Sequence, residues 1–144
     1  MDIRERLAIW ALRLLGVGFV LFGALFAFAP EATLRTFNRW GEWFGITTEL
    51  PPEGVGFWRV LTIAFMVIVT VLAFWGSVRT PAQRALLTVL IIGKATSSLT
   101  ALAFYLWERP LFIYLLNFVV DGAIALLVGV CLMWLQRGVS VPSR

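Results

Sequence analysis

Histidine is absent from this sequence of 144 residues, and cysteine occurs once, at Cys131. These absences exclude haem iron held by histidine, zinc sites built from Cys and His, iron–sulfur clusters held by cysteines, internal disulfides and every catalytic triad that uses histidine. Cys131 lies in the apolar run 128–132, so we interpret it as a small buried hydrophobic residue. The sequence therefore predicts no metal site and no catalytic residues, and we expect a protein that is not an enzyme.

Charged residues are scarce as well, because Asp, Glu, Lys and Arg make up 14% of the chain while hydrophobic residues make up 60%. Soluble domains average roughly 25% charged and about 45–50% apolar residues. A chain this short cannot bury so much apolar surface inside a water-soluble globule, and it is too hydrophobic for a disordered protein. Lipid is therefore the expected environment of most of the molecule.

Four apolar stretches are long enough to cross a bilayer as helices, which takes about 20 residues. Pro and Gly residues fall between these stretches, where helices end, and apolar residues run continuously instead of alternating as in barrel strands. The predicted fold class is therefore all-α: a single polytopic membrane domain over residues 1–144, built as a bundle of four transmembrane helices. The spans are predicted at about residues 7–28, 56–75, 85–107 and 111–135.

Arg residues are shared unevenly between the two ends of the predicted bundle. The end that holds both termini carries six Arg and two acidic residues, whereas the opposite end carries four Arg and five acidic residues. Short cytoplasmic loops are enriched in Lys and Arg, so we expect both termini in the cytoplasm. Eleven Arg against one Lys favours a GC-rich bacterial genome, and hence a bacterial cytoplasmic (inner) membrane. We interpret the net charge of +4 as this topology signal, and we expect no nucleic acid partner.

The first span also has an alternative interpretation as a signal peptide, because Ala27-Phe28-Ala29 resembles a signal-peptidase site. The apolar region of a signal peptide is about 7–15 residues long, which is shorter than this span. We therefore expect the first span to be a transmembrane helix.

The longest loop, residues 30–55, contains a predicted amphipathic helix over about residues 31–44. Apolar residues recur there at spacings of three and four, and polar residues occupy the other side. Such a helix lies flat in the membrane interface with its aromatic side chains at the acyl boundary. We interpret it as a docking surface or lid, or alternatively as a connector that seals the end of the bundle. The candidate docking residues are Phe37, Trp40, Trp43 and Phe44.

Two charged residues, Lys94 and Asp121, fall near the middle of the third and fourth spans. A charge at the centre of a bilayer is costly and needs a partner or a function. The two spans are antiparallel neighbours, so we predict an intramembrane ion pair or a shared water-filled pocket. Asn117 lies one turn from Asp121, and Ser97 and Ser98 lie one turn from Lys94, which extends the candidate polar site.

Small residues within the spans predict close helix packing in lipid. The positions concerned are Gly16 and Gly23 in the first span, Gly93 in the third and Gly129 in the fourth. We expect the third and fourth spans to approach each other along this line of small residues.

Several roles are open for the candidate polar site. Three alternatives are considered: a structural pair that fixes helix register, a binding site for an amphipathic or anionic small molecule, and a proton or ion relay. A Ser–Lys hydrolase would need Ser98 and Lys94 to cooperate, but their spacing supplies no oxyanion hole. A retinal-like Schiff base on Lys94 is disfavoured because four helices are too few to enclose the chromophore.

The sequence resembles the DoxX-like small four-helix membrane proteins of bacteria over roughly its first 90 residues. The resemblance lies in residues 12–16 and Gly23 of the first span, Pro30 before the aromatic loop, residues 57–59 at the start of the second span, and residues 80–84 in the following turn. It implies the four-helix fold and a role in redox or quinone-associated complexes. Lys94 and Asp121 do not map onto that family.

The lack of catalytic groups and of an extramembrane domain favours a non-catalytic accessory or assembly subunit of a larger membrane complex. The alternative is a protein that binds or transports a small molecule, a lipid or quinone, or an ion at the Lys94–Asp121 site. Expected partners are the lipid bilayer and either other membrane subunits or further copies of the chain. No cofactor is predicted beyond a bound lipid or quinone.

Overall fold

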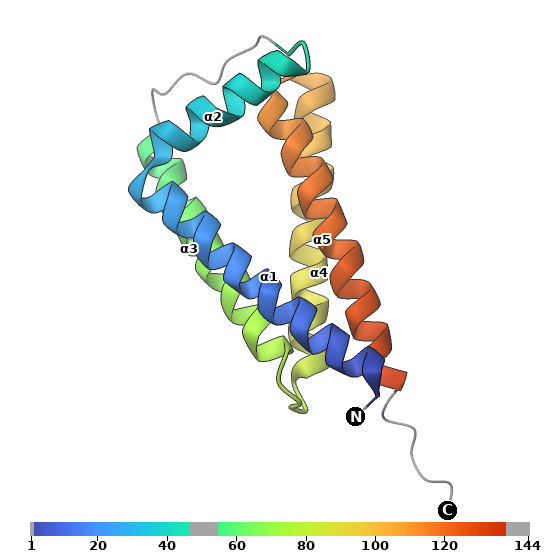
Figure 1. Cartoon of the computed structure of the whole chain (residues 1–144). Helices are drawn as coiled ribbons and strands as arrows, with labels where there is room; N and C mark the ends of the chain where they lie inside the picture. The colour runs from blue at the N-terminus through green and yellow to red at the C-terminus, as the bar shows by residue number, and fades with distance from the viewer. Residues whose placement is uncertain (1, 47–54, 138–144) are drawn as a thin grey trace, which may run out of the picture.

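The computed structural model describes residues 2–46 and 55–137, leaving out the side chains of residues 55–59 and 137. Within these residues the chain forms five α-helices and no β-strand (Figure 1), which confirms the all-α fold class. Residues 47–54 and 138–144, which include part of the predicted loop, lie outside the described residues, as do the side chains of residues 57–59. The helices are α1 (Ile3–Phe28), α2 (Pro30–Trp43), α3 (Val55–Gly76), α4 (Gln83–Trp107) and α5 (Phe112–Arg137).

Three helices of the described residues, α1, α4 and α5, are long and apolar enough to cross a membrane. At a rise of 1.5 Å per residue, a helix of 25 residues extends about 38 Å, which exceeds the hydrocarbon thickness of roughly 30 Å. The apolar part of α3 over Val60–Gly76 is shorter than these three spans. The protein is therefore a helical membrane protein, and its apolar helices contact the lipid bilayer.

The helix bounds follow local signals in the sequence. The backbone N–H of Asp2 donates a hydrogen bond of 3.3 Å to Glu5, which stabilises the first turn and places the start of α1 at Ile3, before the predicted start near residue 7. Pro30 is the first residue of α2, where its missing N–H costs nothing. Gly45 has a φ of +74°, a conformation that glycine adopts freely, and it follows the end of α2.

The long helices are arranged as two pairs. The most extensive contacts join α1 with α3 and α4 with α5. Figure 1 shows that the two pairs converge at the end that carries the N-terminus and diverge toward the other end, where α2 crosses from α1 to α5. A single residue, Ala29, separates α1 from α2.

The hydrophobic core lies between the two helix pairs. Cys131 is 1% exposed and belongs to this core, which confirms its interpretation as a buried hydrophobic residue. Leu12, Leu87 and Val128 are fully buried and come from α1, α4 and α5, so this cluster holds the pairs together. The other buried members are Ala8, Phe19, Val69, Ala73, Leu90 and Leu135.

Helices approach each other closely at only some of the small residues predicted from the sequence. A Cβ at Gly16 would lie 2.9 Å from an aromatic ring of α3, and a Cβ at Gly23 would lie 3.2 Å from an α3 methionine, so α1 and α3 approach closely there. The expectation for Gly93 and Gly129 is wrong, because a Cβ at either position would meet no atom within 4 Å. Helices α4 and α5 approach instead at Gly122, where a Cβ would lie 3.1 Å from a serine hydroxyl oxygen.

Candidate functional site

The centre of the candidate site is an ion pair between α4 and α5. The Lys94 ammonium nitrogen Nζ lies 2.7 Å from Asp121 Oδ1, and the two residues are 2% and 4% exposed. A short, charge-assisted hydrogen bond of this kind offsets much of the cost of removing two charges from water. The structure therefore brings together the two charges that the sequence places at the middle of their spans.

Two aromatic rings complete the surroundings of the Lys94 ammonium group. Its nitrogen lies 4.9 Å from the ring centroid of Phe19 on α1 and 5.1 Å from that of Phe65 on α3. The face of an aromatic ring carries negative electrostatic potential and attracts a cation within about 6 Å. Lys94 thus contacts α1, α3 and α5 from its position on α4. Neither Phe residue can be identified from the sequence, because twelve Phe are present and their spacing does not reveal which of them face Lys94.

The remaining polar residues of the predicted site also lie between α4 and α5. Asn117 Nδ2 donates a hydrogen bond of 3.1 Å to Ser97 Oγ, and Ser98 Oγ donates one of 2.8 Å to the backbone oxygen of Phe118. The Ser98 proton is therefore directed to a carbonyl oxygen and not toward Lys94. This geometry gives no support to the hydrolase hypothesis, which needs the lysine to accept that proton.

A cavity of about 380 Å³ lies beside the ion pair, and it is bounded mainly by α1, α2 and α5. Its lining is apolar and aromatic except at one region, where Lys94, Asn117 and Asp121 reach it. Gly18 of α1 also lines the cavity, and a Cβ at this position would meet no atom within 4 Å. The aromatic lining comes from α1 and α2, namely Phe19, Phe22, Phe26, Phe37 and Trp40.

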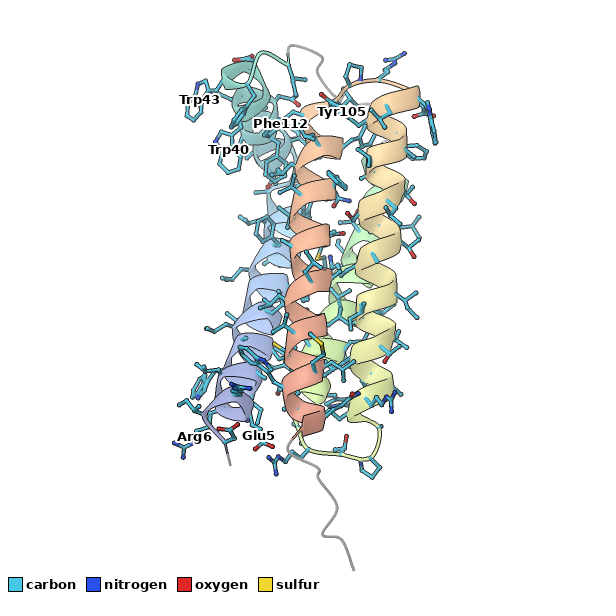
Figure 2. The ribbon with its side chains drawn as sticks, turned by 90° about the vertical axis from the view of Figure 1, so that its right-hand side faces the viewer. Glu5, Arg6, Trp40, Trp43, Tyr105 and Phe112 are labelled. Carbon is cyan, nitrogen blue, oxygen red and sulfur yellow. The ribbon has the colours of Figure 1, made fainter. Side chains whose placement is uncertain are left out.

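Helix α2 lies over one end of this cavity. Phe37 is 7% exposed, and its ring centroid lies 6.4 Å from that of Phe26 and 5.6 Å from that of Trp40. Figure 2 shows Trp40 and Trp43 on α2 at the same end of the molecule as Phe112. The four candidate docking residues therefore differ in role: Phe37 and Trp40 line the cavity, whereas Trp43 is 75% exposed. Phe44, also exposed, stacks on Phe112 with centroids 5.4 Å apart.

A second ion pair lies at the opposite end of the molecule, near the N-terminus (Figure 2). Glu5 of α1 is 4% exposed and accepts a hydrogen bond from the guanidinium group of Arg79, which lies between α3 and α4. Gln83 Nε2 donates a hydrogen bond of 2.9 Å to the backbone oxygen of Gly76 in the same region. In the sequence, Glu5 and Arg79 serve only to orient the chain, because nothing in a separation of 74 residues indicates that the two side chains are in contact.

Within the described part of the chain, no three side chains of the His, Cys, Asp or Glu type are grouped so that they could hold a metal ion. No family model, no curated protein and no solved structure matches the chain. The resemblance to DoxX-like proteins therefore stays a prediction that rests on the residues given for it above.

Proposed function

We propose that the protein binds a small amphipathic molecule in the cavity beside the Lys94–Asp121 pair. The cavity of about 380 Å³ is the observation that carries this proposal. Sites for small molecules enclose roughly 300–1,000 Å³ and combine a mostly apolar, aromatic lining with a few polar groups that orient the ligand. A pair that served only to fix helix register would need no open space beside it.

The proposal includes a membrane arrangement. We propose that α1, α3, α4 and α5 form a bundle of four transmembrane helices and that α2 lies at the membrane interface. Helix α3 has 22 residues and would extend about 33 Å, which supports its role as a fourth span. The distribution of Arg supports a bacterial cytoplasmic membrane with both termini inside.

A proton or ion relay is the less favoured use of the same residues. A relay needs a chain of titratable groups that leads toward each side of the membrane. Among the described residues that line the cavity, Lys94 and Asp121 are the titratable ones, and they bond to each other. This arrangement supports a closed polar site over a conduction path.

The accessory-subunit hypothesis has its support in the sequence, and the bundle has an apolar exterior. Lipid covers such an exterior as well as a partner subunit would, so the exterior does not favour either one. The cavity favours ligand binding specifically, and we therefore place binding first. Association with other membrane subunits, or with further copies of the chain, remains a second proposal that native purification addresses.

The test is to identify what the protein retains when it is purified from its native membrane in a mild detergent. Lipophilic molecules are extracted and quantified by mass spectrometry for the wild type, for Gly18→Phe and for Gly129→Phe. Both glycines have open space at the Cβ position, but only Gly18 lines the cavity. We expect a specific molecule to be retained by the wild type and by Gly129→Phe and to be lost from Gly18→Phe. Equal content in all three proteins would contradict ligand binding, and a stoichiometric protein partner would favour the accessory role.

A further inference from the structure

We infer that the ligand of this cavity is a neutral lipophile whose polar end carries a hydroxyl group. The inference rests on the proposed binding function and names the chemical class that the described groups would select. Three properties of the cavity carry it: the charge balance of the ion pair, the hydrogen-bonding capacity left on α5, and the position of the cavity next to lipid.

The charge balance favours a neutral ligand. Lys94 and Asp121 neutralise each other at 2.7 Å, and two ring faces already contact the ammonium group. A ligand charge of either sign would lose its hydration on entering the cavity and would find no unpaired counter-charge there. The anionic ligand considered from the sequence is therefore disfavoured, since Lys94, the one cation among the described residues that line the cavity, is already paired.

The hydrogen-bonding capacity favours a ligand group that both donates and accepts, as a hydroxyl does. Asn117 Nδ2 donates one hydrogen bond to Ser97, and Lys94 donates one to Asp121 Oδ1, so one N–H of Asn117 and two of Lys94 remain, the latter beside the rings of Phe19 and Phe65. No described residue donates to Asn117 Oδ1 or to Asp121 Oδ2. No buried side-chain oxygen of the described residues lacks a partner, so these two oxygens keep accessible surface, and both residues line the cavity.

The two acceptors are placed to receive one polar group. Asn117 and Asp121 are four residues apart on α5, so their side chains are neighbours on one face of the helix. A hydroxyl group that donates to either oxygen would satisfy an acceptor that the cavity otherwise leaves without a partner. An ether or ketone oxygen can accept from the remaining N–H groups, but it has no proton to donate and leaves both acceptors without a partner.

The position of the cavity favours a lipophile. Phe22 of α1 and Val120 of α5 line the cavity and are 48% and 44% exposed on the surface that contacts lipid. Buried Phe37 of α2 lies over its other end. A molecule dissolved in the bilayer can therefore enter between α1 and α5, with its apolar body against the aromatic lining.

The test compares four probes with the same hydrocarbon chain and different polar ends. The wild-type protein is reconstituted in phosphatidylcholine nanodiscs, and binding of tritiated farnesol is measured by scintillation proximity. The unlabelled competitors are farnesol, farnesyl methyl ether, farnesylamine and farnesoic acid. We expect farnesol to compete best and the ether roughly tenfold or more weakly, as the loss of a hydrogen bond to a charged group implies. The charged amine and acid should also compete roughly tenfold or more weakly, because their charge would lose its hydration without gaining a counter-charge.

Two variants link the preference to the named atoms. Asn117→Leu removes one acceptor, so it should lower the affinity for farnesol more than that for the ether. Gly18→Phe should abolish binding of all four probes, whereas Gly129→Phe should match the wild type.

If the four probes compete equally and Gly18→Phe abolishes the binding of all four, the hydroxyl inference is overturned while binding in the cavity stands. If farnesol binding is absent, the inference is also overturned, and the extraction experiment decides separately on the binding function. If farnesol binds equally to Gly18→Phe and to the wild type, it binds outside the cavity and both proposals lose their support.

Discussion

Removing one partner of the Lys94–Asp121 pair should destabilise the protein strongly. Both side chains are at most 5% exposed, so the partner left behind keeps its burial and loses its counter-charge. Such changes typically cost about 3–5 kcal/mol, and we expect this loss for Lys94→Met. Asp121→Asn should cost less stability, because the ammonium group of Lys94 still contacts two ring faces. Each such contact contributes roughly 0.5–2 kcal/mol.

The double variant Lys94→Met/Asp121→Leu distinguishes the cost of an orphaned charge from the value of the pair. Replacing both members of a buried pair by apolar residues is often neutral or stabilising by about 1–4 kcal/mol. We therefore expect the double variant to be at least as stable as the better single variant, with a strongly non-additive cycle. The assay is the free energy of unfolding in mixed micelles of increasing denaturing detergent, followed by circular dichroism.

The exposed pair Arg35–Glu31 on α2 provides a matched control. Its atoms lie 3.6 Å apart and its side chains are 76% and 74% exposed, so Arg35→Gln should change stability by less than about 1 kcal/mol. Additive losses from the two single variants at Lys94 and Asp121, or losses as small as those of the control, would refute the view that this pair is desolvated.

Three further predictions concern other parts of the fold. Arg79→Gln should lower the unfolding free energy more than Arg84→Gln in the same detergent titration, because only Arg79 compensates a buried carboxylate; equal effects would contradict the contact. Gly16→Ala should destabilise by about 1–3 kcal/mol through overpacking against α3, whereas Gly18→Ala should be tolerated, and a reversed order of thermal stability would refute the close approach. Cys131 should react with N-ethylmaleimide only after unfolding, as mass spectrometry before and after denaturation will show, and rapid labelling of the folded protein would contradict its burial.

The sequence predicts the helices well because their ends carry strong local signals. Pro30 and Pro110 follow the first and third spans, and the helices there end at Phe28 and Trp107, two and three residues before these prolines. The contact between Lys94 and Asp121 can also be predicted from the sequence, because two opposite charges at similar depth in antiparallel neighbouring helices have few other partners.

The sequence analysis allows a water-filled pocket at Lys94 and Asp121, but the size and the apolar lining of the cavity could not be predicted, because they depend on how the helix pairs diverge. The angle between helices results from how side chains interdigitate along the whole contact, and no single residue specifies it. The error at Gly129 has the same origin: spacing identifies a small residue, but only the rotation of α5 decides whether it faces α4 or open space. Phe19 and Phe65 were missed for this reason too.

The connection through Ala29 has a mechanical consequence. Since one residue separates α1 from α2, a change in the tilt of α1 carries α2 with it. Transmembrane helices adjust their tilt to the thickness of the hydrocarbon layer. We therefore expect the position of Phe37 over the cavity to follow bilayer thickness, so that lipid chain length would change how far the cavity is covered.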